Sequence, residues 1–80
     1  MKLPRDLSGA ELAKALRLLD YTVVRQDGSH LRLTTQRDGQ NHVTIPNHRA
    51  LKIGTLRAIL KAVGEHHSMS VEEIAGELGL

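Results

Sequence analysis

The fold of this chain is decided by residues 26–33, which read Gln26-Asp27-Gly28-Ser29-His30-Leu31-Arg32-Leu33. Asp27-Gly28 is a typical turn pair, because glycine adopts positive φ without steric cost and aspartate bonds to the backbone that follows it. After the turn, apolar and polar residues alternate as they do in a half-buried strand. We therefore expect Leu31 and Leu33 to face a core, and His30 and Arg32 to face outward.

On this outer face, His30 is the residue best suited to act in catalysis. It lies two positions from Arg32 and beside the amides of Gly28 and Ser29. Arginine side chains and backbone amides are common phosphate ligands, so the turn and the strand start form a plausible phosphate site. The same pattern also fits an ordinary solvated strand, in which His30 is only a surface residue.

Two further strands are predicted beside this one. Residues 21–25 are rich in β-branched side chains, which favour a first strand. The second strand runs from His30 to about residue 36. A second turn signal, Arg37-Asp38-Gly39, leads into a third strand over residues 40–46, in which apolar and polar residues again alternate. The sequence thus predicts an antiparallel meander.

The register of the second hairpin follows from the positions of its apolar residues. A two-residue loop would set Leu33 opposite Thr44 and mix the two faces of the sheet. A three-residue loop with Gly39 in a left-handed conformation sets Leu33 opposite Val43, and we therefore predict that loop. The other expected pairs are Leu31 with Ile45, Arg32 with Thr44, Thr34 with His42, and His30 with Pro46.

Capping signals predict the helices on either side of the strands. Ser8 and Glu11 form a capping box, so a first helix begins at Gly9 and ends near residue 20. A second helix is predicted over residues 55–63, with Gly64 as its stop. A second capping box at residues 70–73 begins a short last helix.

This order of elements predicts an α+β fold. Both major helices must cover one face of the sheet, because the other face carries the polar residues, and the result is a two-layer sandwich of helix, three-stranded antiparallel sheet and helix. The same order occurs in double-stranded-RNA-binding domains. A short C-terminal helix completes the chain, which we expect to be a single domain over residues 1–80.

Composition restricts the classes of protein that fit. The chain has no cysteine, which excludes a disulfide framework and a thiolate site. Its first residues contain no apolar run long enough for a signal peptide or a membrane span, so we expect a cytoplasmic protein. The chain contains one tyrosine, Tyr21, and no phenylalanine or tryptophan. That count excludes the base-stacking platforms of RNA-recognition motifs.

The net charge of +2 is divided unevenly along the chain. Residues 1–63 carry all 11 Lys and Arg with five of the nine acidic residues, a balance of +6, whereas residues 64–80 carry four glutamates and no Lys or Arg. A basic body favours an anionic partner such as nucleic acid held through its backbone. A surface that serves only solubility has the same composition.

The histidines do not form a recognisable metal motif. The chain has five of them, at positions 30, 42, 48, 66 and 67, without His-Glu-x-x-His spacing or nearby carboxylates. We therefore expect no metal and no cofactor. Residues 69–80 are similar to the opening helix of a helix-turn-helix motif but lack a recognition helix, so we expect no DNA binding by the chain itself.

Four segments together carry a family resemblance. They are residues 9–16, 21–30, 43–48 and 51–61. In this order and spacing they resemble the HicA family of mRNA interferase toxins, along residues 6–64, which leaves residues 65–80 as an acidic extension. The chain departs from the family at Asp20, where a glycine usually precedes the aromatic residue.

The resemblance implies a fold, an activity and a partner. It implies the toxin of a type II toxin-antitoxin system, with a fold like that of double-stranded-RNA-binding domains. Such a toxin is a ribonuclease that cleaves mRNA without a metal, through the histidine that corresponds to His30. It further implies neutralisation by a HicB-type antitoxin, which we expect to cover His30.

The chemistry of metal-free RNA cleavage agrees with these residue types. It needs a base for the 2′-hydroxyl proton, a cation for the charge that develops on phosphorus, and an acid for the leaving oxygen. His30 is the candidate base, and His48 or Lys52 is a candidate acid or second cation. The candidate RNA- and phosphate-binding residues are Gly28, Ser29, Arg32, His48 and Lys52. The alternatives are a non-catalytic module that binds structured RNA and a protein that acts mainly by pairing with another protein.

Overall fold

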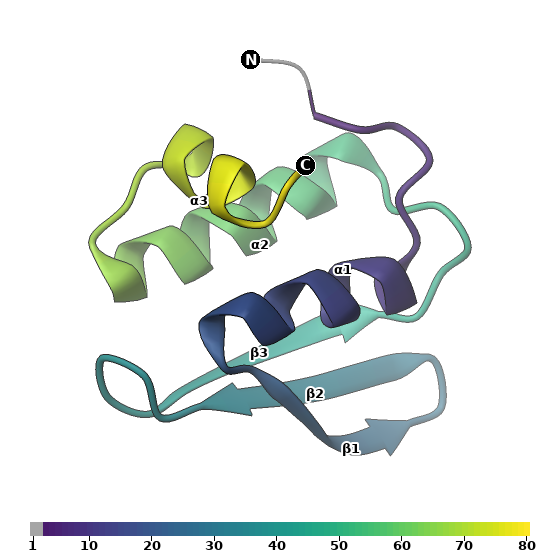
Figure 1. The fold of residues 1–80 in the computed structure, drawn as a ribbon. Coiled ribbons are helices and arrows are strands. Elements are labelled where there is room, and N and C mark those ends of the chain that lie inside the picture. The colour runs from purple at the N-terminus through teal and green to yellow at the C-terminus, as the bar shows by residue number, and fades with distance from the viewer. Residues whose placement is uncertain (1–2) are drawn as a thin grey trace.

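A computed structural model describes residues 3–80 and confirms the α+β sandwich (Figure 1). The elements are α1 (Gly9–Ala15), the 3-10 helix η1 (Leu16–Leu19), β1 (Thr22–Asp27), β2 (His30–Thr35), β3 (Asn41–Pro46), α2 (Ile53–His67) and α3 (Val71–Glu77). The antiparallel sheet has the order β1-β2-β3, and α1 and α2 lie on one of its faces. Within residues 3–80, no helix is both long and apolar enough to cross a membrane.

The core lies between this face of the sheet and the two helices. Alternate residues of β2 and β3 point into it, and so do residues spaced three or four apart on the helices. The fully buried members include Leu12, Leu16, Leu33, Ile45, Leu56, Leu60 and Val63. Burying a side chain of this size contributes roughly 1.5–3 kcal/mol to the free energy of unfolding. These apolar positions therefore determine that the helices pack on this face of the sheet.

The register of β2 against β3 is as the sequence predicts. Leu33 lies opposite Val43 and Leu31 opposite Ile45, and the polar pairs of the outer face follow. Gly39 has a φ of 95°, in the left-handed region. The pairing of β1 with β2 contains a bulge at Val24, because Val23 pairs with Leu33 while Arg25 pairs with Arg32. All three strands begin or end within two residues of the predicted bounds.

The helix starts are predicted well, but the end of the second helix is not. Both capping boxes are present, at Ser8 with Glu11 and at Ser70 with Glu73. The prediction that Gly64 stops the second helix is wrong, because α2 begins at Ile53 and continues to His67. The stop is Ser68, which adopts a left-handed conformation with a φ of 59°.

Gly64 has a packing role instead. A Cβ atom at this position would overlap the carbonyl oxygen of Met69 and would lie 3.3 Å from Cγ1 of Ile74. The amide of Met69 also donates a hydrogen bond of 2.8 Å to the Gly64 carbonyl. Glycine therefore lets the chain turn back closely over α2, and the turn delivers α3 onto the core.

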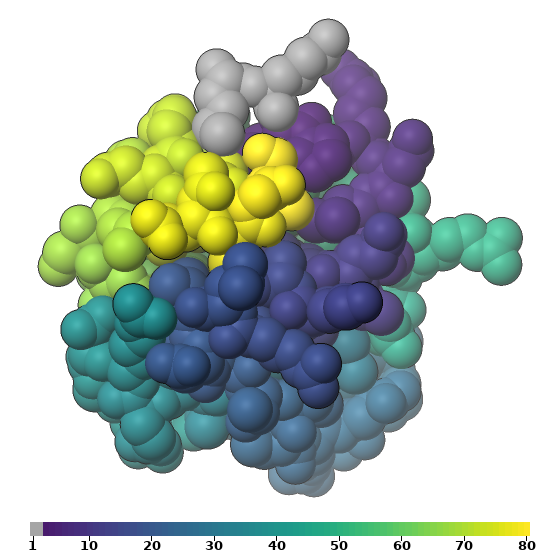
Figure 2. Space-filling view, in the orientation of Figure 1, coloured from purple at the N-terminus to yellow at the C-terminus, as the bar shows by residue number. Residues whose placement is uncertain are grey.

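The acidic C-terminal extension is part of this core. Ile74 and Ala75 of α3 are fully buried and Leu78 nearly so, in the same cluster as Leu3 and Leu12. Helix α3 packs against α2 on the side away from the sheet (Figure 1). In Figure 2 the C-terminal residues fill the surface between the N-terminal segment and α1. The glutamates of α3 are exposed.

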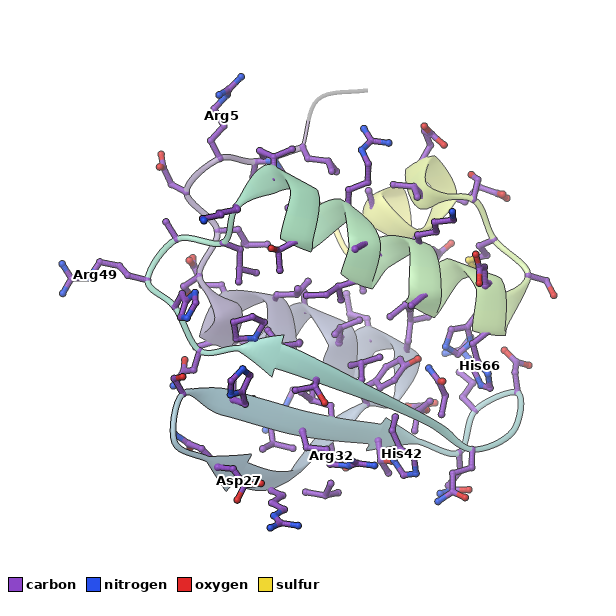
Figure 3. All side chains as sticks on the ribbon, turned by 180° about the vertical axis from the view of Figure 1, so that it is seen from behind. Arg5, Asp27, Arg32, His42, Arg49 and His66 are labelled. Carbon is purple, nitrogen blue, oxygen red and sulfur yellow. The ribbon has the colours of Figure 1, made fainter. Side chains whose placement is uncertain are left out.

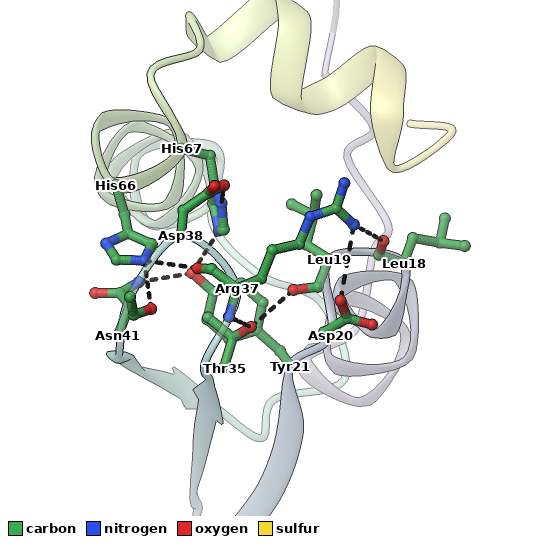
Figure 4. A network of polar contacts seen from close by, with 11 residues as sticks. Leu18, Leu19, Asp20, Tyr21, Thr35, Arg37, Asp38, Asn41, His66 and His67 are labelled. Atoms are coloured by element: carbon green, nitrogen blue, oxygen red, sulfur yellow. Dashed lines mark hydrogen bonds and ion pairs between the residues drawn. The ribbon is translucent and has the colours of Figure 1, made fainter.

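A chain of polar contacts ties the end of α2 to the β2–β3 hairpin (Figure 4). The Asn41 amide donates to Tyr21 Oη at 2.6 Å. This leaves the phenol hydrogen for Nε2 of the buried His67 at 3.2 Å, and Nδ1–H of His67 then donates to the Asp38 carboxylate at 2.9 Å. The bond from His67 lowers the pKa of Asp38, and burial raises the pKa of Tyr21.

Two neighbouring contacts fix the hairpin loop further. Nε2 of His66 donates to the carbonyl oxygens of Gly39 at 2.9 Å and Arg37 at 3.1 Å. Thr35 Oγ1 donates to the Leu19 carbonyl at 2.9 Å. The two adjacent histidines thus bind the same loop through different partners. Contacts from both α2 and η1 hold this loop in place.

Replacing Gly64 by alanine tests the close return of the chain. We expect Gly64→Ala to lower the free energy of unfolding by about 1–3 kcal/mol, because the new methyl group must displace backbone atoms of Met69. Gly76→Ala is the matched control, since that helical glycine has open space and alanine favours a helix by up to ~1 kcal/mol. Urea unfolding measures both, and equal stabilities of the two variants would contradict the packing role.

Candidate functional site

His30 lies at one end of the sheet, directly after the β1–β2 turn. Its Cα partners are Asp27 on β1 and Pro46 on β3, so Gly28 and Ser29 alone form the turn, with Gly28 at a φ of 56°. The His30 side chain is exposed. It takes part in none of the side-chain hydrogen bonds or ion pairs formed among residues 3–80. Both ring nitrogens are therefore open to a ligand.

Backbone contacts gather other segments at this end of the sheet. The Asn47 amide donates to the Ser29 carbonyl, and the Gly9 amide donates to the His48 carbonyl at 2.9 Å. A Cβ atom on Gly9 would overlap the Pro46 carbonyl oxygen, so only glycine lets α1 begin against the end of β3. Of the predicted site residues, Gly28, Ser29, His30 and His48 are thus brought together.

Arg32 lies on the same outer face of β2 as His30. Its Cα partners are Arg25 on β1 and Thr44 on β3. Arg25 has an ion pair of 2.8 Å with Asp27, but Arg32 has none with any carboxylate of residues 3–80. Like charges directly opposite each other destabilise a sheet. A bound anion would relieve that repulsion, and the outer face near His30 is therefore suited to phosphate.

An open groove of about 660 Å³ runs between β3 and α2 and includes His30. Its lining residues from the strands are His30, His42, Val43, Thr44 and Pro46, and those from the helix are Gly54, Thr55, Ala58, Ile59 and Ala62. Lys52, the exposed N-cap of α2, immediately precedes the helical part of this lining. Because β3 and α2 run in opposite directions (Figure 1), Lys52 lies at the same end of the groove as Pro46, the β3 partner of His30.

The sequence does not predict the helical wall of this groove. The predicted register places His42 and Thr44 on the outer face, and Figure 3 shows His42 and Arg32 together there. Nothing in the spacing of Gly54, Ala58 and Ala62 shows that this side of α2 runs along β3. Their small size at intervals of four residues indicates only that they share one side of the helix.

A second hollow, of about 410 Å³, lies between α1 and β1. Lys14 and Arg17, which are both exposed, line it together with Val23 and Leu31. None of the candidate site residues contributes to it. Among residues 3–80, no group of three His, Cys, Asp or Glu side chains is placed to hold a metal ion.

Comparison with known families decides where the chain belongs. A family model described as the HicA toxin of bacterial toxin-antitoxin matches residues 9–65. The chain belongs to the HicA toxin family. It is thus the toxin of a toxin-antitoxin system, and a cognate antitoxin is its partner. The match spans every element from α1 to most of α2 and includes all of the candidate site residues of this HicA protein. Searches of curated proteins and of solved structures found no match.

Replacing Arg32 by threonine tests the phosphate role of the outer face. We expect Arg32→Thr to change the free energy of unfolding by no more than about 0.5 kcal/mol, because the residue is exposed and faces Arg25. Binding to poly(U) should weaken, and the slope of log K against log[salt] should fall by about one. Fluorescence anisotropy over a salt series measures this slope.

Arg5→Thr is the control for this experiment. Arg5 projects on the side of the molecule away from the sheet (Figure 3), so its loss should leave the slope unchanged. Equal slopes for Arg32→Thr and the parent chain would show that the outer face does not hold the RNA backbone.

Proposed function

We propose that this HicA toxin is an endoribonuclease that cleaves mRNA without a metal, with His30 as the general base. The observation that carries the proposal is the state of His30: exposed, unpaired among the described residues, and on the same face as the uncompensated Arg32. Family membership supports the toxin role, and the residue types support the chemistry.

The proposed reaction is an intramolecular transesterification of RNA. A neutral His30 takes the proton of a 2′-hydroxyl, and the oxygen attacks the adjacent phosphorus. The bond from phosphorus to the 5′-oxygen breaks, which leaves a 2′,3′-cyclic phosphate and a 5′-hydroxyl. A positioned base of this kind contributes about 10²–10⁴ in rate.

The remaining roles fall to the residues around His30. Arg32, with the amides of Gly28 and Ser29, supports the phosphate and the charge that develops on it. His48 or Lys52 protonates the leaving 5′-oxygen. His48 is supported by its backbone bond at the same end of the sheet, and Lys52 by its place before the groove.

Replacing His30 by alanine separates an enzyme from a binding module. We expect His30→Ala to reduce cleavage of a reporter mRNA by about 10²-fold or more, and to abolish growth arrest on expression. Because His30 has no side-chain partner among residues 3–80, the free energy of unfolding should change by no more than about 0.5 kcal/mol. RNA affinity, which depends on many Lys and Arg contacts, should be nearly intact.

Two results would contradict the proposed function. Equal cleavage by the parent chain and His30→Ala would remove the histidine from the mechanism. RNA binding by a parent chain that neither cleaves nor arrests growth would favour the non-catalytic module. Addition of EDTA to the cleavage assay tests the remaining claim, and loss of activity on chelation would contradict the metal-free route.

We further propose that the cognate antitoxin is of the HicB type and acts by covering His30. His30 is exposed in the isolated toxin, so a protein seated there would exclude RNA. Excess antitoxin should stop cleavage, raise the unfolding temperature by mass action, and slow carbethoxylation of His30 by diethylpyrocarbonate. An antitoxin that binds tightly while His30 still reacts at its free rate would contradict occlusion.

A further inference from the structure

The β3–α2 groove has two walls of matching length. Four residues separate His42 from Pro46, a span of about 13 Å along a strand. Eight residues separate Gly54 from Ala62, a span of about 12 Å along a helix. Strand β3 and helix α2 run in opposite directions (Figure 1), so Pro46 and Gly54 share one end and His42 and Ala62 the other. His30, paired with Pro46, stands at the first end.

Small residues keep the helical wall of the groove low. Gly54, Ala58 and Ala62 are exposed and recur every four residues, which places them on one side of α2. A Cβ atom on Gly54 would contact nothing within 4 Å. The apolar part of the lining is completed by Val43, Pro46 and Ile59. The result is a slot that is shallow on one side and bounded by the sheet on the other.

The polar groups of the groove are histidines and threonines. His30 and His42 belong to the strand wall, and Thr55 belongs to the helix. Thr44 lies on β3 between His42 and Pro46, the residue that pairs with His30. No carboxylate contributes to the lining. The positive charges stand outside it, with Arg32 on the adjoining sheet face and Lys52 before α2. An apolar slot with uncharged polar groups, flanked by cations, complements a nucleobase attached to a phosphate backbone.

We propose that this groove binds the unpaired base next to the scissile phosphate, so that His30 acts on single-stranded RNA. The inference rests on the proposed function, because His30 is both the end of the groove and the proposed base. A base has an apolar face and a polar edge. The face can stack on the His42 ring and pack on Ala58, while Thr44 and Thr55 reach the edge.

The geometry of the chemistry favours the same class of substrate. Attack by the 2′-oxygen requires that oxygen to lie in line with the bond that breaks, and a regular A-form helix holds it out of line. A base that has left its stack frees the backbone to rotate into line. A base within a duplex, stacked and paired, cannot enter a slot beside β3. The groove thereby selects an unpaired nucleotide and aligns it in one step.

Filling the groove tests this inference. Ala58→Leu adds an apolar side chain to the middle of the slot and keeps a good helix former at an exposed position. For a short single-stranded oligonucleotide we expect kcat/KM to fall about 10-fold or more, as expected for the loss of one stacked base. Ala10→Leu is the matched control, because Ala10 is exposed and lines the other hollow. It should stay within about twofold of the parent chain.

A binding measurement keeps the inference separate from the cleavage reaction. A 2′-O-methyl trinucleotide cannot be cleaved, and titrated into the labelled parent chain it should shift the NMR signals of Thr44, Gly54 and Ala58. The shifts of Thr44 and Gly54 should be lost in Ala58→Leu and kept in His30→Ala. Shifts without cleavage by the parent chain would contradict the proposed activity but support the groove.

Three outcomes would contradict the proposal that the groove binds an unpaired base. The first is normal cleavage by Ala58→Leu while His30→Ala is inactive, which would leave the proposed function standing. The second is equal affinity for the trinucleotide and for a duplex of the same sequence. The third is that the NMR signals of the groove residues shift on addition of the antitoxin but not on addition of RNA. The groove would then be a protein docking site.

Discussion

The pairing of β2 with β3 is the constraint on which the rest of the structure depends. It sets Leu31 and Leu33 against Ile45 and Val43, and these four side chains form the floor on which both helices pack. A slip of one residue would turn every side chain of β2 to the other face. The core would then contain an arginine and a histidine. The burial of two leucines is thus the physical reason that His30 reaches solvent.

The two ends of the β2–β3 hairpin differ in the contacts that hold them. At the loop end, the side chains of His66 and His67 hold the chain through carbonyl oxygens and the Asp38 carboxylate. At the opposite end, where His30 lies, backbone hydrogen bonds and the close approach of Gly9 to Pro46 hold the segments together, and Arg25 forms an ion pair with Asp27. The side chains of His30 and Arg32 therefore remain available for a ligand, whereas those of His66 and His67 are bonded within the protein.

The C-terminal extension adds stability beyond the segment that matches the HicA family. The match ends at residue 65, whereas His67, Ile74, Ala75 and Leu78 beyond it are all buried. A chain of this length is close to the size at which one core supplies only a few kcal/mol of net stability. The extension contributes apolar surface to that core, and its glutamates are exposed.

Local signals in the sequence predict the three strands, the register of β2 against β3, the starts of α1 and α3 and the outward direction of His30, because alternation, turn residues and capping boxes act over a few neighbouring residues. They misplace the end of α2, since Gly64 is a helix stop in local terms and a packing site only when Met69 and Ile74 lie against it. Tertiary structure alone decided that α2 runs along β3 and forms a groove with His42, and that His67 meets Tyr21 and Asp38. Those contacts join segments far apart in the chain, and the packing of whole elements sets them.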